Sequence, residues 1–159
     1  MLLNFFKELG YVHCGYLQRL SENKGSKDKE LWYKFVIINK QLCNSPGPLV
    51  YLWFYKDEMI YVGETSLSIK ERITKGHFGG FRGGSYSGVE RQKQLLLLEE
   101  DEIYVLVAFE PFFLKYLHEQ VNRNNFSNMI SPLQSDMLLG KYLEEKSIIA
   151  MLNPKLNIK

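Results

Sequence analysis

Cysteine, long apolar runs and an excess of charge of one sign are all scarce in this sequence of 159 residues. Its two cysteines, Cys14 and Cys43, lack metal-site spacing and are too few for a disulfide scaffold, so we expect two reduced thiols. No apolar run approaches the roughly 18 residues that a membrane-spanning helix requires. These absences exclude a disulfide-rich secreted module and predict a protein without membrane association.

Targeting signals, repeats and nucleotide-binding motifs are missing as well. Residues 1–10 carry charges at Lys7 and Glu8 and contain no cleavage-type segment, which predicts a cytoplasmic protein. No Gly-x-x-x-x-Gly-Lys-Ser/Thr segment occurs, so a nucleotide-binding P-loop is not supported. With 45% apolar residues, the chain is predicted to form one domain over residues 1–159, because most domains contain roughly 100–200 residues.

The formal net charge is only +2, which excludes a protein that binds nucleic acid through bulk positive charge. The charges are nevertheless unevenly distributed, because residues 66–94 contain six basic residues against Glu71 and Glu90, and four acidic residues follow at 99–102. The basic residues are Lys70, Arg72, Lys75, Arg82, Arg91 and Lys93. This stretch is either a local patch for a polyanion or a solvated surface of mixed sign.

Hydrophobic periodicity and breaker residues predict a mixture of helices and strands. Residues 1–47 are interpreted as an N-terminal extension, with a short helix near Leu2–Leu9, a polar loop at 21–29 and an ambiguous apolar segment at 31–42. A β-hairpin is predicted at 49–62, then a helix at 67–75 capped by Thr65 or Ser66. The later predictions are a glycine-rich loop (76–88), a helix (89–98), a third strand (103–109), a helix (111–122), a polar connection (124–132) and a last helix from Ser135 or Asp136 to Leu152.

The last predicted helix contains a local anomaly. Apolar side chains recur every three or four residues at Leu138, Tyr142, Ile149 and Leu152, and Glu145 occupies the missing position of that series. Glu145 is therefore predicted near the centre of the apolar face, while Glu144 is predicted to point away from it. A carboxylate in such a position is unfavourable unless a cation, a metal or a hydrogen-bond donor meets it. The alternative is that Glu145 lies at the edge of the apolar stripe.

Five short segments occur in an order that is typical of one enzyme family. They are Leu49-Val50-Tyr51, Ile60-Tyr61-Val62-Gly63, Arg72 on the following helix, Glu145 on the last helix and Pro154-Lys155-Leu156-Asn157. In this order they resemble the motifs of the GIY-YIG nucleases, and the resemblance covers about two thirds of the chain, from Leu49 to Asn157. It implies an α/β (α+β) fold in which a small central three-stranded antiparallel sheet is flanked by helices.

The chain departs from the family pattern at several positions. Leu49 stands where the family usually has glycine, and Arg72 lies eleven residues after Tyr61, one more than expected. The histidine usually found one helical turn after the arginine occurs here five residues later, as His77, and Lys75 could serve as the cation in its place. A long insertion, 110–135, precedes the last helix.

These residue types suit phosphodiester hydrolysis. Glu145 would hold a divalent ion, Mg²⁺ or Mn²⁺, since Mg²⁺ is commonly bound through one or two carboxylates and several waters. Arg72 would bind the phosphate oxygens, and Tyr51 would position or deprotonate the attacking water with help from His77 or Lys75. Tyr61 would hydrogen-bond the phosphate or the water, and Asn157 would hold the ends of the site together.

The sequence therefore predicts a metal-dependent endonuclease of double-stranded DNA, similar to a small type II restriction enzyme that acts as a homodimer. The candidate DNA contacts in residues 66–94 are Lys70, Lys75, Arg82, Arg91 and Lys93. Arg123 is a further candidate, because it lies in the insertion with asparagine and glutamine side chains able to read base edges. The alternatives are a phage or mobile-element nicking enzyme of loose specificity, an inactive nucleic-acid-binding protein on the same scaffold, and a protein-interaction module. The sequence does not distinguish DNA from RNA as the target.

Overall fold

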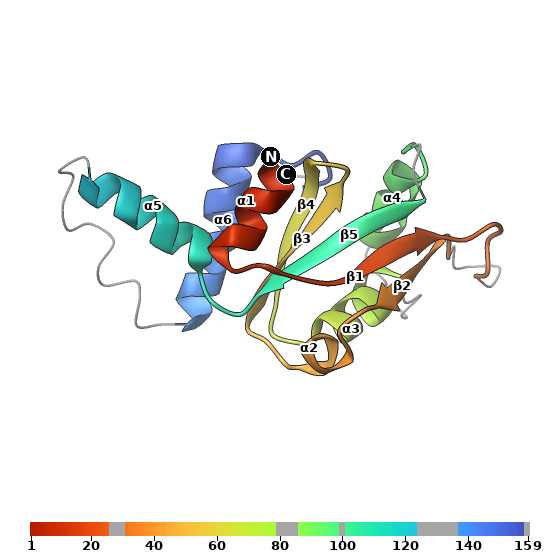
Figure 1. Ribbon diagram of the computed structural model, residues 1–159. Helices are drawn as coiled ribbons and strands as arrows, with labels where there is room; N and C mark the ends of the chain where they lie inside the picture. Colours follow the sequence, from red (N-terminus) through yellow and green to blue (C-terminus); the bar gives the residue numbers. More distant parts are fainter. Residues whose placement is uncertain (26–30, 79–85, 99–100, 124–136, 158–159) are drawn as a thin grey trace.

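Five strands form one antiparallel sheet at the centre of the protein (Figure 1). The computed structural model describes residues 1–25, 31–78, 86–98, 101–123 and 137–157. The strand order across the sheet is β2-β1-β5-β3-β4. The predicted mixture of helices with an antiparallel sheet is confirmed, but the predicted number of three strands is wrong.

The hairpin at the start of the family-like region is confirmed. Strand β3 (Leu49–Tyr55) pairs with β4 (Glu58–Thr65), and Lys56 adopts a positive φ of 54° in the tight turn between them. Residues 49–54 of β3 are all buried, because branched and aromatic side chains point to both faces of the sheet and both faces are covered. Strand β5 (Glu102–Ala108) pairs with the other edge of β3.

The N-terminal residues are part of the sheet and not an extension beside it. After helix α1 (Leu2–Leu9), β1 (Val12–Arg19) pairs with β5, and β2 (Tyr33–Ile37) pairs with β1. Helix α2 (Lys40–Asn44) completes this half. The ambiguous apolar segment 31–42 thus contains a strand and the start of a helix. Pairing with β5 stabilises β1 although its sequence, with a histidine, a glutamine, an arginine and a glycine, is a weak strand signal.

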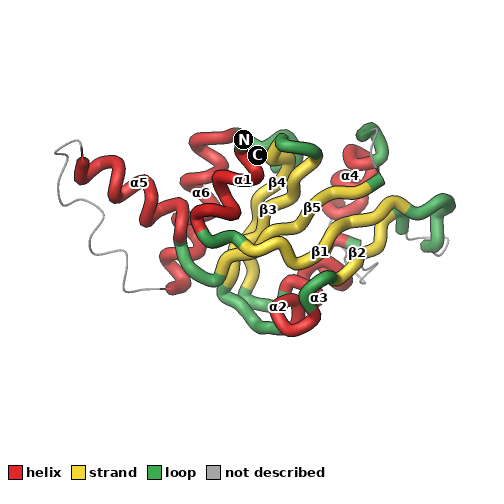
Figure 2. Tube along the Cα trace, viewed as in Figure 1, coloured by secondary structure: helices red, strands yellow, loops and turns green. Residues whose placement is uncertain are grey.

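Helices cover both faces of the sheet, which gives three layers (Figure 2). On one face lie α2, α3 (Ile69–Glu71), the π-helical turn η1 (Arg72–His77) and α4 (Tyr86–Leu95); Trp53 of the sheet packs there with Ile69, Ile73 and Leu95. On the other face lie α1, α5 (Phe112–Arg123) and α6 (Met137–Leu152). None of the helices within the described ranges has both the length and the apolar character to cross a bilayer.

Helix α3 begins after Ser68 and not after either of the predicted caps. Ser68 caps α3, because its Oγ accepts a hydrogen bond from the backbone N–H of Glu71 at 3.2 Å. The predicted caps Thr65 and Ser66 are therefore wrong; Thr65 ends β4 instead. The predicted starts Ser135 and Asp136, the connection 124–132 and most of the glycine-rich loop lie outside the described residues.

Helix α6 is rotated relative to the prediction. Glu144 is fully buried and Ile148 lies with it in the core, whereas Tyr142 is 50% exposed and Leu152 is 37% exposed. Glu145, whose side chain is 14% exposed, lies beside the buried face and not at its centre. The prediction that Glu144 points away from the core is therefore wrong. The prediction failed because, among residues 140–152 of α6, the buried positions are occupied by a glycine, a glutamate and an isoleucine, which the apolar pattern does not reveal.

Glu144 is buried because three donors surround its carboxylate. Tyr11 donates its hydroxyl to Oε1 at 2.5 Å, and the backbone N–H groups of Phe113 and Leu114 donate to Oε1 and Oε2, each at 2.8 Å. These N–H groups belong to the first turn of α5, where no intrahelical acceptor exists. Burial raises the pKa of Glu144, and the three hydrogen bonds oppose that rise. One side chain thus joins α6, α5 and the start of β1.

We expect Glu144→Ala to lower the free energy of unfolding by about 3 kcal/mol, because it leaves three buried donors without an acceptor. Its neighbour provides a matched control: Glu145→Ala should change stability by less than about 1 kcal/mol, because its partner Lys146, at 3.8 Å, is exposed and such an ion pair contributes little. Urea denaturation followed by circular dichroism measures both values. Equal losses of stability in the two variants would show that the buried hydrogen bonds of Glu144 contribute no more to folding than the Glu145 side chain does.

Candidate active site

The hydroxyl of Tyr51 lies at the centre of a cluster of predicted site residues. The Nε–H of Arg72 donates to this oxygen at 3.1 Å, and Nε2 of His77 lies 2.6 Å from it. Tyr51 is completely buried and His77 is nearly so, with the imidazole packed between the rings of Trp53 and Tyr61 at 4.8 and 5.5 Å. Three side chains that are distant in sequence therefore converge on one oxygen atom.

The π-helical turn η1 explains how His77 reaches Tyr51 although it lies five residues after Arg72. In an α-helix, side chains four residues apart share a face, and a fifth residue turns away from it. In η1 the turn is widened, and the backbone N–H of Phe78 bonds to the carbonyl of Ile73 at 2.9 Å, five residues back. The additional residue is accommodated in this wider turn, so Arg72 and His77 both contact Tyr51.

Lys75, the other candidate for the role of His77, lies elsewhere. Its Nζ forms an ion pair with Glu71 at 2.8 Å on the exposed side of the helix. Gly76 also contributes to the site, because a Cβ at this position would lie 3.2 Å from Nη1 of Arg72. The missing side chain lets the guanidinium group lie against the turn. Of the two alternatives, the geometry brings His77 and not Lys75 to Tyr51.

The two motif tyrosines are diagonal neighbours in the hairpin. Tyr51 pairs with Gly63 and Tyr61 pairs with Trp53, and the rings of the two tyrosines are 5.8 Å apart. The Tyr51 ring crosses directly over Gly63, where an added Cβ would lie 2.5 Å from the Tyr51 hydroxyl. Glycine at position 63 is thus required by the ring that carries the central hydroxyl.

Burial sets the protonation of this cluster. Burial raises the pKa of Tyr51 well above its ordinary value and Tyr61 adds to the rise, while the charge of Arg72 opposes it. Burial, Arg91 and Arg72 together lower the pKa of His77 well below its ordinary value. At neutral pH the imidazole is therefore uncharged, and it contacts Tyr51 as a hydrogen-bonding group and not as a cation.

Glu145 approaches the same end of the sheet from α6. Burial raises its pKa, the charge of Lys146 lowers it, and Glu64 of strand β4 raises it again. The positive charges of Lys141 and Arg72 also act on it. Sequence analysis did not identify Glu64 or Lys141, which form an ion pair. A signal for Lys141 existed, because it lies four residues before Glu145 and so shares its helix face.

Glu145 and Glu64 could together hold a divalent ion that keeps most of its waters. Within the described ranges, no three histidine, cysteine or acidic side chains come together in the arrangement of a metal site. Glu145 with Glu64 nearby supplies the one or two carboxylates through which Mg²⁺ commonly binds, with waters completing its shell. Lys141 balances Glu64 and donates to the hydroxyl of Ser66 at 3.2 Å.

Asn157 connects the end of the chain to strand β4. Its Oδ1 accepts from the backbone N–H of Val62 at 2.9 Å, and its Nδ2 donates to the carbonyl of the same residue at 2.6 Å. The backbone N–H of Leu156 bonds to the carbonyl of Ile60 at 2.8 Å. The side chain thus satisfies both polar groups of one edge-strand residue, directly after Tyr61. It positions the strand and makes no contact with Tyr51, Arg72 or Glu145 among those described.

The predicted substrate-binding residues fall into three groups. Lys70 and Lys93 are exposed, while Lys75 is exposed and paired with Glu71. Arg91 is only partly exposed and contacts His77 and Tyr61. Arg82 lies outside the described residues, and Arg123 is described only as the last residue of α5.

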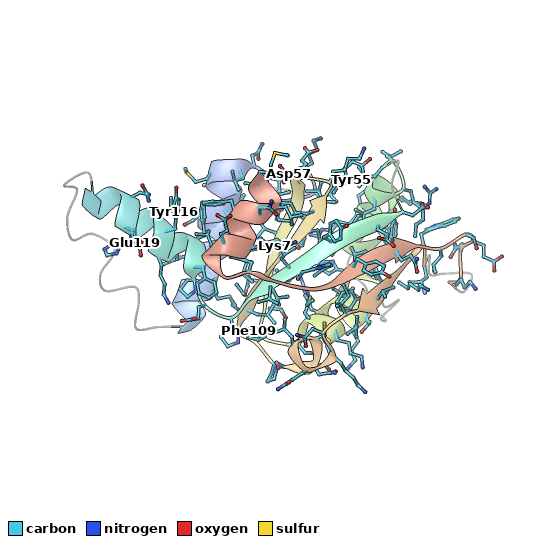
Figure 3. The ribbon with its side chains drawn as sticks, viewed as in Figure 1. Lys7, Tyr55, Asp57, Phe109, Tyr116 and Glu119 are labelled. Atoms are coloured by element: carbon cyan, nitrogen blue, oxygen red, sulfur yellow. The ribbon has the colours of Figure 1, made fainter. Side chains whose placement is uncertain are left out.

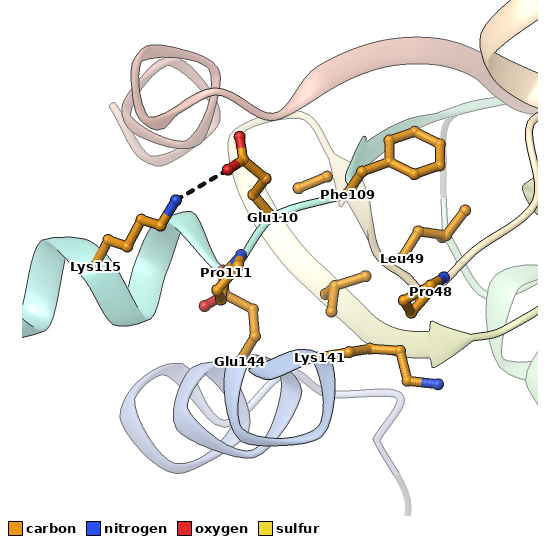
Figure 4. A pocket seen from close by; sticks show the side chains of 10 residues that line it. Pro48, Leu49, Phe109, Glu110, Pro111, Lys115, Lys141 and Glu144 are labelled. Atoms are coloured by element: carbon orange, nitrogen blue, oxygen red, sulfur yellow. Dashed lines mark hydrogen bonds and ion pairs between the residues drawn. The ribbon is translucent and has the colours of Figure 1, made fainter. Parts of the chain in front are cut away.

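A cavity of about 130 Å³ lies next to this site, between the sheet and α6 (Figure 4). Its wall is mostly apolar, with Leu49 and Phe109 on the sheet side, and Lys141 and Glu144 line it from α6. Glu144 is already bound by three donors, and Lys141 is paired with Glu64. The cavity therefore shares a wall with the candidate site but brings no additional unpaired charge to it.

Comparisons of this chain with protein-family models, with curated proteins and with solved structures find no match. The site is therefore interpreted from its own geometry and from the motif pattern of the sequence.

Proposed function

We propose that this protein is a metal-dependent endonuclease that hydrolyses phosphodiester bonds in double-stranded DNA. The observation that carries the proposal is the convergence of Arg72 and His77 on the Tyr51 hydroxyl, at the end of the sheet that Glu145 also approaches. A cationic fork, a polarised phenol and a carboxylate are the groups that attack on a phosphodiester requires.

Each side chain has a distinct role in the proposed reaction. Tyr51 stays a neutral phenol, because burial raises its pKa, and it positions the attacking water through an oxygen that Arg72 and His77 hold in place. Arg72 also has guanidinium N–H groups other than the one bound to Tyr51, and these bind non-bridging phosphate oxygens as negative charge grows in the transition state. Tyr61 lies beside Tyr51 and orients the phosphate or the water.

Glu145, with Glu64 beside it, would hold Mg²⁺ or Mn²⁺. The ion, when bound, would polarise the scissile phosphate and stabilise the leaving oxygen. The half-buried position of Glu145 is suited to this role, because a carboxylate screened from water interacts more strongly with a cation than an exposed one does.

The ordered motifs support membership of the GIY-YIG family, and the π-helical turn reconciles the displaced His77 with that pattern. We propose a cytoplasmic enzyme similar to a type II restriction endonuclease, acting as a homodimer. The alternatives are a nicking enzyme of loose specificity and an inactive nucleic-acid-binding protein. The fully formed contacts around Tyr51 favour an active enzyme over an inactive one.

Cleavage of a mixed-sequence plasmid tests the proposal. We expect the wild type to cut it with Mg²⁺ or Mn²⁺ and not with chelator. Tyr51→Phe, Arg72→Ala and Glu145→Ala should each lower kcat at least on the order of 10²-fold, because each removes a group that acts in the transition state. Glu119→Ala is the control, since Glu119 is exposed on α5 away from the sheet (Figure 3).

The products distinguish the candidate functions. Discrete fragments support a site-specific enzyme, whereas smears or nicked circles support loose specificity. An uncut plasmid that still binds the wild-type protein, at any metal concentration, would rule out the enzymatic function and leave the nucleic-acid-binding protein.

The pH dependence of cleavage should depend on Glu64. Glu145 must be ionised to hold the metal, so activity falls as the pH drops through the Glu145 pKa, which burial and Glu64 raise. Replacing Glu64 with glutamine removes a negative charge and releases Lys141, and both changes lower that pKa. We therefore expect Glu64→Gln to move the acid limb of kcat/KM to lower pH at saturating Mg²⁺.

A matched control for this shift is Glu58→Gln, at the start of the same strand, where Glu58 pairs with Lys155 on the surface. Its acid limb should stay at the wild-type position. A ¹³C NMR titration of the Glu145 carboxyl in metal-free protein measures the same pKa directly. An unchanged pKa in Glu64→Gln would contradict the coupling of the two carboxylates.

A further inference from the structure

Arg91 does not lie with the exposed basic side chains of its helix. Its Nη1 is 3.4 Å from Nδ1 of His77, and its guanidinium carbon lies 4.6 Å from the centre of the Tyr61 ring. The flat guanidinium group is attracted to the negative face of that ring, which holds it in place. Lys93, two residues along α4, is exposed. Arg91 therefore packs behind the cluster around Tyr51.

The contact with Arg91 determines which nitrogen of His77 carries the proton. A guanidinium group has only donors, so Nδ1 of His77 must be the acceptor in this contact. A neutral imidazole has one N–H, and that proton is then on Nε2. A charged imidazolium is disfavoured, because His77 is buried between two cationic side chains, Arg91 and Arg72.

A histidine next to a catalytic tyrosine can serve as the base that accepts the tyrosine proton, and this tautomer excludes that role for His77. With its proton on Nε2, His77 donates to the Tyr51 oxygen across the 2.6 Å contact and cannot accept the tyrosine proton there. Arg72 donates to the same oxygen at 3.1 Å. Two side chains thus donate to the Tyr51 oxygen, and neither of them removes its proton.

We propose that Arg91 is a positioning residue that holds His77 as the neutral Nε2–H tautomer, so that His77 donates a hydrogen bond to Tyr51 and does not act as its base. The consequence for catalysis rests on the proposed nuclease function, whereas the tautomer itself does not. This role differs from the direct DNA contact that the sequence predicts for Arg91.

Long-range ¹H–¹⁵N NMR of the imidazole groups reads the tautomer without reference to activity. The chain has three histidines, and His77→Gln assigns the signal of His77 by its loss. In the wild type we expect Nε2 protonated and Nδ1 unprotonated. Arg91→Gln should populate the Nδ1–H tautomer, because an amide oxygen can accept from that nitrogen. Lys93→Gln, on the same helix, should leave the spectrum unchanged.

Cleavage kinetics of the same variants separate positioning from binding. If Arg91 positions His77, Arg91→Gln should lower kcat on the order of 10-fold or more, while KM for DNA and its salt dependence stay unchanged. Arg91→Lys should fall between, because it keeps the charge but loses the planar fork. A higher KM with a weaker salt dependence would instead identify Arg91 as a phosphate contact.

The outcomes distinguish the two proposals. A wild-type His77 protonated on Nδ1, or a His77 tautomer that is unchanged in Arg91→Gln, overturns the role of Arg91 whatever the enzyme does. Conversely, the expected tautomers in a protein that cuts no DNA would support the role of Arg91 in positioning His77 and overturn only the nuclease function.

Discussion

The structure depends on the burial of strand β3 on both of its faces. Side chains alternate along a strand, so Tyr51 and Trp53 point to one layer of helices while Val50 and Leu52 point to the other. The first layer supplies Arg72 and His77 to the Tyr51 hydroxyl, and the second supplies the helix that carries Glu145. Strand β4 is the edge next to β3, and both layers reach it. A site built from both layers can form only where the sheet ends.

His77 contacts Tyr51 although its spacing from Arg72 in the sequence does not fit an α-helix. A fixed α-helical period places a residue five positions after Arg72 on a different face, and this made His77 a poor match to the family pattern. The π-helical turn changes that period locally. Ile73 and Phe78, whose backbone groups close this turn, are both buried in the core, so the turn is formed together with the tertiary packing. The widened turn cannot be deduced from the apolar pattern of the six residues of η1.

Elements with strong local signals were predicted correctly, and those that depend on distant partners were not. The hairpin was predictable because its branched and aromatic residues flank a polar turn. Strands β1 and β2 were missed because a glycine, a histidine and a glutamine weaken the pattern of β1, which exists through pairing with β5. Helix α6 was predicted, but its buried face was not, because a glutamate such as Glu144 is not expected in a core. Only the position of Tyr11 and of the first turn of α5 makes Glu144 acceptable in the core.

The two adjacent glutamates of α6 illustrate how similar residues acquire different roles. Glu144 is held by three donors that carry no formal charge, so its carboxylate joins parts of the fold. Glu145 is influenced by charged groups, two of them also contacting other members of the site: Lys141, which pairs with Glu64, and Arg72, which donates to Tyr51. Its ionisation is therefore coupled to the residues that would bind and polarise a phosphate. The modest net charge of the chain is compatible with this arrangement, because cations placed within a few side chains of a half-buried carboxylate act on it with little screening by salt. In the proposed function, local placement and not total charge would let this edge of the sheet bind a phosphodiester.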